Sequence, residues 1–179
     1  MDLLIKKGKE LQLDEITQIN LAKAREFNAP PLNDNQLSSH LHFLLLENDK
    51  IIATGELLPV DQINFDGEIF SILGIGGIVA NAKGKGHGKQ IMTAIRNYLI
   101  ENNKTGVGFC RLYNKGFYEK CGFIVDENVI NRFVYYDGEK KITDTEDHCV
   151  FWVDSSDNFM AKVLSKPNIE ILLNRPPNW

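Results

Sequence analysis

The sequence has few cysteines, no long apolar segment and no signal-like N-terminus. Its 179 residues include three cysteines, and no two of them form a C-x-x-C pair, which argues against a disulfide framework or a zinc site. No run approaches the roughly 20 apolar residues of a membrane span. The N-terminus lacks the basic-then-apolar pattern of a signal peptide. We therefore expect a cytoplasmic protein with no membrane partner and no bound metal.

An excess of basic residues is also absent. The net charge is −4, and acidic and basic residues are mixed along the chain. This balance disfavours nucleic acid as a partner and mildly favours a cationic substrate. A chain of 179 residues has the usual size of one domain, so we expect a single domain over residues 1–179.

The most informative segment that is present is a glycine-rich loop, which reads K-G-K-G-H-G-K from Lys83 to Lys89. It follows a buried-looking strand and precedes an amphipathic helix. Closely spaced glycines let a phosphate approach the backbone and permit turns that point several N–H groups at one place. The start of the following helix adds unpaired N–H groups and the positive end of its dipole. The loop is therefore predicted to hold an anion, and a pyrophosphate suits it best.

Spacing excludes two common phosphate loops. A Walker A loop needs Gly, four residues and then Gly-Lys-Ser/Thr, but here Lys83 stands at the first glycine position and Gln90 follows Lys89. A dinucleotide-binding G-x-G-x-x-G pattern fails from each starting glycine, namely Gly74, Gly84 and Gly86. Neither a P-loop nucleotidase nor a Rossmann dehydrogenase is indicated.

Two segments together resemble the GCN5-related N-acetyltransferase (GNAT) superfamily, whose loop reads Gln/Arg-x-x-Gly-x-Gly/Ala. Gly86 and Gly88 fill the two small positions, and Lys83 stands where Gln or Arg is usual. Residues 114–123, N-K-G-F-Y-E-K-C-G-F, resemble the later motif of that family, a short helix with an aromatic pair before Gly-Phe. The resemblance implies an α/β (α+β) fold with a twisted, mostly antiparallel mixed sheet, a central splay and helices on both faces.

The resemblance also implies a reaction, the direct transfer of an acetyl group from acetyl-CoA to a primary amine of a small molecule in a ternary complex. The Ile78 N–H would hold the tetrahedral oxyanion, and Tyr118 would protonate the departing thiolate. His87, within the loop, is expected to be exposed. The residues expected to contact the cofactor are Ile78, Val79, Ala80, Lys83, Gly84, Lys85, Gly86, His87, Gly88, Lys89, Asn114 and Tyr118.

A narrower resemblance concerns the aminoglycoside 2'-N-acetyltransferases, on residues 114–123, 149–154 and the final Trp179. Those enzymes carry a glutamate base on the central strand, where this chain has Gly76. Glu56 is the favoured substitute, with Glu68 and the terminal carboxylate of Trp179 as alternatives. The missing base also leaves open a second function, an acyl-CoA-binding sensor or interaction module without catalysis. No motif identifies the acceptor, and a homodimer remains an alternative to a monomer.

Hydrophobic periodicity and turn signals predict the order of elements. A helix should begin with Asp14 as its N-cap and end before Pro30 and Pro31, and Asp137-Gly138 should form a turn. The expected strands are 2–7, 41–47, 51–58, 69–80, 107–110, one starting at residue 124, 132–136 and 149–153, and the other expected helices are 33–40, 88–102 and a short one around residue 118.

Overall fold

The computed structural model describes residues 1–143 and 148–174. Its contacts divide the chain into two compact units. The first unit comprises Met1–Leu58 and Ile75–Ile95, and the second comprises Pro59–Gly74 and the described residues from Arg96 onward. Two long strands each contribute one part to each unit. The single domain predicted over residues 1–179 stays a prediction.

The first unit is built on antiparallel strands. Strands β1 (Asp2–Lys7), β2 (Leu41–Glu47) and the first part of β3 (Lys50–Phe65) pair in that order. The last part of β4 (Glu68–Ala80) also belongs to this unit. Its helices are η1 (Gly8–Glu10), α1 (Leu13–Phe27), α2 (Asp34–Ser39) and the beginning of α3 (His87–Glu101).

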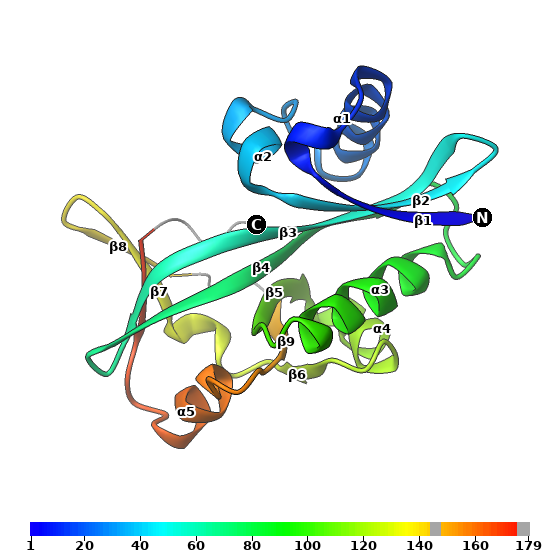
Figure 1. Cartoon of the computed structure of the whole chain (residues 1–179). Helices are drawn as coiled ribbons and strands as arrows, with labels where there is room; N and C mark the ends of the chain where they lie inside the picture. Colours follow the sequence, from blue (N-terminus) through cyan, green and yellow to red (C-terminus); the bar gives the residue numbers. More distant parts are fainter. Residues whose placement is uncertain (144–147, 175–179) are drawn as a thin grey trace. The chain divides into compact units, whose positions relative to one another are not determined.

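Apolar packing holds the helices of the first unit against its strands. Helices α1 and α2 lie over one face of β1, β2 and β3, and the beginning of α3 lies against the other face (Figure 1). Ile19 of α1 packs with Leu44 of β2 and Ile51 of β3 in one buried cluster. Burial of such side chains contributes about 1.5–3 kcal/mol each, so this contact determines where α1 is placed.

Helix α1 begins earlier than the sequence suggested. Its N-cap is Gln12, whose backbone N–H donates to the Glu15 carboxylate at 2.8 Å. Asp14 is therefore not the N-cap; it lies in the first turn and accepts a hydrogen bond from Gln18 at 2.7 Å. The helix ends before the two prolines, as predicted, because Asn28 adopts a left-handed conformation with φ 52°.

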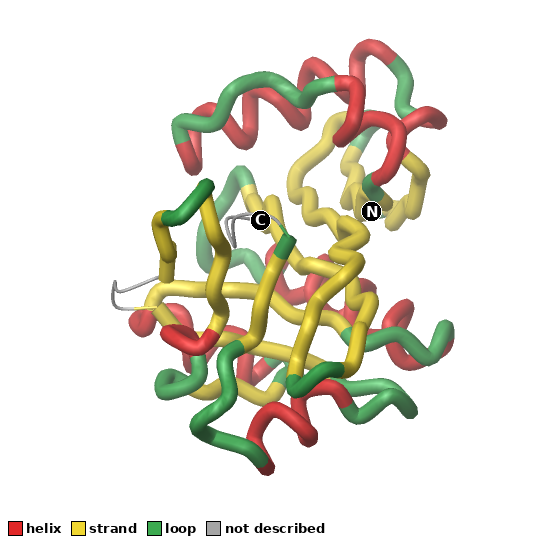
Figure 2. Tube along the Cα trace, turned by 90° about the vertical axis from the view of Figure 1, so that its left-hand side faces the viewer, coloured by secondary structure: helices red, strands yellow, loops and turns green. Residues whose placement is uncertain are grey.

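The second unit contains the strands that follow α3, and Figure 2 draws all strands of the chain in yellow. With its parts of β3 and β4, the strand order is β6-β9-β5-β4-β3-β10-β7-β8. Strand β10 runs parallel to β7 and antiparallel to β3, so the sheet is mixed, as the fold-class prediction required. The strands are β5 (Gly106–Arg111), β6 (Ile124–Asp126), β7 (Phe133–Asp137), β8 (Lys140–Thr143), β9 (His148–Val153) and β10 (Ile171–Leu173).

Short helices connect these strands. They are η2 (Leu112–Asn114), α4 (Lys115–Lys120), η3 (Ile130–Arg132) and α5 (Phe159–Ser165). No sequence pattern predicted β8, β10 or α5, which are only three to seven residues long. No helix within the described ranges is both long and apolar enough to cross a membrane.

Gly108 of β5 allows a close approach between strands of the second unit. It stands opposite Phe151 of β9, and a Cβ at Gly108 would lie 2.3 Å from the Cζ atom of the Phe151 ring. Phe151 is fully buried and stacks on Tyr118 with ring centroids 3.9 Å apart. The absence of a side chain at Gly108 therefore makes room for the surface on which Tyr118 rests.

Gly108→Ala is expected to lower the free energy of unfolding by about 1–3 kcal/mol, because the added methyl overpacks a buried ring. Urea denaturation measures the change. Gly116→Ala is the matched control, since a Cβ at Gly116 in α4 meets nothing within 4 Å and alanine favours a helix. Equal stability of the two variants would contradict the close approach of Phe151.

Candidate active site

The glycine loop connects β4 to α3 in the first unit. Gly84 and Gly86 have φ values of 76° and 82°, in the left-handed region that favours glycine. A Cβ at either position would meet nothing within 4 Å, so both face open space. Helix α3 begins at His87, and the Gln90 N–H donates to the Gly86 carbonyl at 3.1 Å. The loop therefore leads directly into the first turn of a helix, where backbone N–H groups have no helical partner.

Contacts with β3 hold the segments at both ends of this loop. The Asn81 backbone N–H donates to the Ile52 carbonyl at 2.9 Å, and its side-chain amide donates to the Ile51 carbonyl at 2.8 Å. At the other end, Gly55 of β3 lies against Ile91 and Ile95 of α3, and a Cβ there would be 2.7 Å from Ile91 Cγ2. The loop is thus held between anchored elements.

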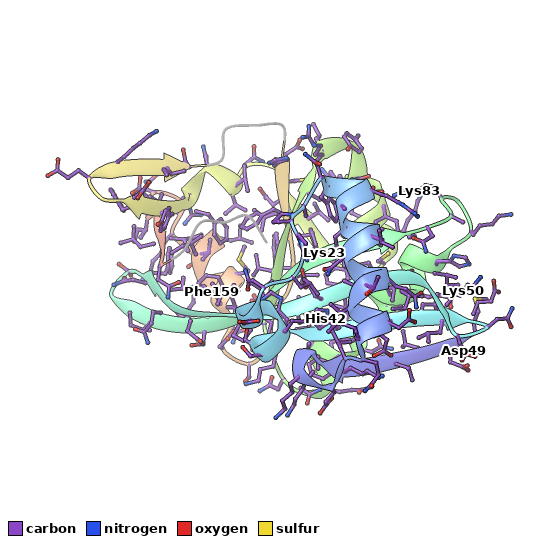
Figure 3. All side chains as sticks on the ribbon, turned by 90° about the horizontal axis from the view of Figure 1, so that it is seen from above. Lys23, His42, Asp49, Lys50, Lys83 and Phe159 are labelled. Atoms are coloured by element: carbon purple, nitrogen blue, oxygen red, sulfur yellow. The ribbon has the colours of Figure 1, made fainter. Side chains whose placement is uncertain are left out.

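The structure shows the burial of His87 and the ion-pair partner of Lys83, two side chains of the loop. His87 is half-buried rather than exposed, and its Nδ1 atom is buried without a hydrogen-bond partner among the described residues. Lys83 is exposed, and its Nζ lies 2.7 Å from the Glu26 carboxylate of α1 (Figure 3). Open glycines, a helix N-terminus and nearby cations form an arrangement that fits a pyrophosphate.

The last residues of β4 precede the loop. Gly77 has a φ of 60°, which breaks the regular strand conformation beside Gly76. Ile78 and Ala80 are half-buried, whereas the Val79 side chain is buried in the core. A Cβ at Gly77 would lie 2.8 Å from the Glu56 Oε1 atom. The glycine therefore lets the Glu56 carboxylate lie directly against β4, one residue before Ile78.

Glu56 is the centre of a buried polar cluster formed by Lys23, His40, His42 and Glu56. Its Oε1 lies 2.6 Å from Lys23 Nζ of α1. Its Oε2 lies 3.2 Å from His40 Nδ1 and 3.8 Å from His42 Nδ1. All four residues are at most 7% exposed. Figure 3 looks down onto α1 and labels Lys23 and His42 in this region.

The cluster keeps Glu56 ionised. Burial raises the pKa of its carboxyl, but the His40 hydrogen bond and the charge and hydrogen bond of Lys23 lower it further, to about 2. A carboxylate with so low a pKa is a weak proton acceptor near neutral pH. Of the two alternative bases, Glu68 pairs with Lys162 at 2.6 Å in the second unit, and Trp179 lies outside the described residues.

Tyr118 and Asn114 belong to the second unit. Asn114 ends η2 and precedes α4, and Tyr118 is buried within α4 against Phe151. Burial raises the pKa of the Tyr118 phenol, and the nearby Cys110, Cys121 and Cys149 raise it further. Gly122 follows the C-cap of α4 with a φ of 85°, in the left-handed region that favours glycine.

All three cysteines are free and buried, as small apolar residues are expected to be. In the described ranges, no group of His, Cys, Asp and Glu is arranged to hold a metal ion.

Sequence reasoning identified Glu56 but not the partners that surround it. Two signals were available. His40 and His42 are two residues apart, the spacing that places strand side chains on one face, and Lys23 lies four residues after the buried Ile19 on α1. A lysine on the apolar side of a helix needs a buried anion, and Glu56 is that anion.

Comparison with solved structures identifies the fold. The acyl-CoA N-acyltransferase from Pseudomonas aeruginosa is 15% identical, with a TM-score of 0.61 over 85% of this chain and 99% of that chain. ElaA from Escherichia coli is 16% identical, with a TM-score of 0.62 over 86% and 100%. Glucosamine-6-phosphate N-acetyltransferase from Arabidopsis thaliana is 19% identical, with a TM-score of 0.51 over 82% and 98%. This chain thus has the acyl-CoA N-acyltransferase fold.

The sequence also matches a protein-family model over part of its length. Residues 38–125 match the model described as an acetyltransferase (GNAT) domain. That segment includes Glu56, the glycine loop and the Tyr118 motif. Residues 38–125 are therefore similar to a GNAT acetyltransferase domain. No curated protein matches the sequence.

Proposed function

We propose that this protein is an acetyl-CoA-dependent N-acetyltransferase that acts on a primary amine of a small molecule by direct transfer. The observation that carries the proposal is the glycine loop, in which Gly84 and Gly86 have positive φ and open space directly before α3. The similarity of residues 38–125 to a GNAT domain implies acyl-CoA as the donor. The cofactor supplies an acetyl thioester, and this chain's own groups bind and orient it.

Binding of the cofactor is assigned to the backbone around the loop. The N–H groups of residues 85–89 would hold the pyrophosphate, and Lys83, Lys85 and Lys89 would place positive charge near it. The end of β4, Ile78–Ala80, would lie along the pantetheine arm. Because the Val79 side chain is buried in the core, the contribution of that residue is made by its backbone alone.

The chemistry has three requirements. An alkylamine with a pKa near 10.4 must lose a proton, which costs roughly 4–5 kcal/mol at neutral pH. The Ile78 N–H would stabilise the tetrahedral oxyanion. Tyr118 would donate a hydrogen bond and then a proton to the thiolate as the carbon–sulfur bond breaks.

Tyr118→Phe is expected to lower kcat by on the order of 100-fold while acetyl-CoA affinity changes little, because only the proton donor is removed. Steady-state kinetics and calorimetric titration separate the two effects. Tyr136→Phe is the control, since Tyr136 on β7 is 48% exposed. An unchanged kcat in Tyr118→Phe would remove this residue from the mechanism.

The second candidate is an acyl-CoA-binding sensor or interaction module without catalysis. It is favoured by Gly76, which lacks the carboxylate that a related subgroup carries there. Thiol release from acetyl-CoA, measured with polyamines, aminoglycosides, amino acids and peptide N-termini, separates the two. Turnover with at least one amine supports the transferase. Tight cofactor binding without turnover on any amine would support the sensor.

A further inference from the structure

The buried cluster around Glu56 lies against β4, next to the residue proposed to hold the thioester oxygen. Glu56 contacts β4 at Gly77, the residue before Ile78, because a Cβ at Gly77 would lie 2.8 Å from Oε1. Under the proposed function, the Ile78 N–H holds the carbonyl oxygen of the thioester. The amine must then reach the same carbonyl carbon, and the polar cluster that lies against Gly77 is a candidate for removing its proton.

Within the cluster, the two carboxylate oxygens have different partners. Lys23 Nζ occupies Oε1 at 2.6 Å, while His40 Nδ1 lies at 3.2 Å from Oε2. A histidine that donates its Nδ1–H to a carboxylate keeps its Nε2 lone pair available as a base. The carboxylate fixes the tautomer and then stabilises the imidazolium that forms. Lys23 holds the carboxylate in place for this contact.

The backbone around His40 is also fixed. Its carbonyl accepts the Gly8 N–H at 2.9 Å. Gly8 approaches Leu37 so closely that a Cβ at Gly8 would lie 2.1 Å from the Leu37 carbonyl oxygen. His40 therefore stands between α2 and β2 at a position set by η1, and its ring reaches Glu56 from a rigid support.

We propose that His40 accepts the proton of the acceptor amine, with Glu56 and Lys23 as the residues that position it. This inference rests on the proposed function and changes the role predicted for Glu56 from base to orienting carboxylate. An N–H bond of the ammonium breaks and its proton passes to His40 Nε2, directly or through one water. The freed nitrogen lone pair attacks the thioester carbon, the carbon–sulfur bond breaks, and the thiolate takes a proton from Tyr118. The nitrogen then loses its second proton, which restores the Tyr118 phenol through solvent. His40 then returns its proton to solvent.

The second histidine of the cluster provides a comparison within the same site. His42 faces Glu56 across the β2–β3 register, but its Nδ1 is 3.8 Å from Oε2, beyond hydrogen-bond distance. His40 contacts Glu56 of β3 and stacks on His42 of β2, and Lys23 of α1 binds the other oxygen of the same Glu56 carboxylate. A role in proton transfer is assigned to His40 because it alone of the two rings makes the close contact.

Chemical rescue tests this assignment. His40→Gly is expected to lower kcat roughly 100-fold, and added imidazole should restore at least a tenth of the activity, more at higher pH. His40→Gln, which keeps a donor toward Glu56, should lose activity without rescue, and His42→Gln should lose less than tenfold. Glu15→Gln breaks a Lys–Glu pair of similar length, 2.7 Å, and should leave kcat unchanged. Unfolding curves and acetyl-CoA affinity confirm that the variants are folded.

The outcomes separate this inference from the function on which it depends. An active wild type with His40→Gly within threefold of its kcat, or a loss that imidazole never restores, would overturn the role of His40 alone. Nitrogen-15 spectra give a readout independent of activity, because the Nδ1–H tautomer is expected in the wild type and not in Glu56→Gln. The opposite tautomer in the wild type would also overturn it. A wild type that binds acetyl-CoA but acetylates no amine would contradict the proposed function itself.

Discussion

Replacement of Gly86 by aspartate is expected to weaken acetyl-CoA binding by roughly 100-fold or more, about 3 kcal/mol. Gly86 has a φ of 82°, which an L residue rarely adopts, and the space beside it is open. In the proposed complex, that space is where the pyrophosphate approaches the backbone. An aspartate there would block the approach, repel the phosphates and strain the loop. Calorimetric titration with acetyl-CoA measures the loss.

Gly138→Asp is the matched control for this variant. Gly138 also has a positive φ, 60°, and also faces open space, but it lies in the β7–β8 turn of the second unit. The same change of residue therefore produces the same kind of backbone strain away from the loop. Normal affinity in Gly138→Asp with a large loss in Gly86→Asp would support the loop. Normal affinity in both would contradict it.

The second large effect is expected at Lys23. Lys23→Met should lower the free energy of unfolding at pH 7 by about 3–5 kcal/mol, because it leaves the Glu56 charge buried without its ammonium partner. The control is Lys6→Met, which breaks the more accessible Lys6–Glu15 pair and should cost less than about 1 kcal/mol. A similar decrease in the free energy of unfolding in both variants would contradict the claim that the Lys23–Glu56 pair is more buried than the Lys6–Glu15 pair. A double variant, Lys23→Met with Glu56→Gln, should recover part of the loss.

The contacts of Glu56 with His40 and Lys23 make the stability of the wild type depend on pH. The pKa of Glu56 is lowered from 4.5 to about 2 in the folded protein. A lowered pKa means that the stabilisation is present above about pH 4.5 and is lost as the pH falls through 2. The difference corresponds to about 3 kcal/mol. Lys23→Met should lose less stability over this acid range than the wild type, and denaturant titrations at a series of pH values measure both slopes.

Sequence patterns predicted the loop better than they predicted the buried cluster. The glycines of the loop act through backbone conformation, which a short local motif encodes. Gly86, one of the two small positions of the motif, has a positive φ, as does Gly84, whereas Gly88 lies in the first turn of α3. The Glu56 cluster joins residues from α1, β2 and β3, and its Lys23–Glu56 contact spans 33 positions. No local pattern reports such a contact, so Glu56 was found without the three residues that determine its chemistry.

The difference between local patterns and distant contacts also explains which helices and strands could be predicted from the sequence. Long, strongly periodic elements such as β2 and α3 were predicted to within one or two residues, because their apolar faces are continuous. Strand β10 has only three residues and is stabilised by pairing with β3 and β7, both remote in sequence. Helix α5 depends on the Asp154 carboxylate, which accepts the N–H groups of Met160 and Ala161 at 2.9 Å. Neither the pairing of β10 nor the hydrogen bonds from α5 to Asp154 produces a recognisable pattern in the sequence of that strand or helix.

The function proposed for this chain is the transfer of an acetyl group from acetyl-CoA to a primary amine. Incubation of the wild type with acetyl-CoA and the amine panel, followed by mass spectrometry of acceptors and protein, tests it directly. We expect one or more amines to gain a single acetyl group on nitrogen, in step with release of free CoA, and we expect Gly86→Asp to abolish both. Release of CoA without any acetylated amine, or no reaction despite saturated cofactor binding, would contradict it.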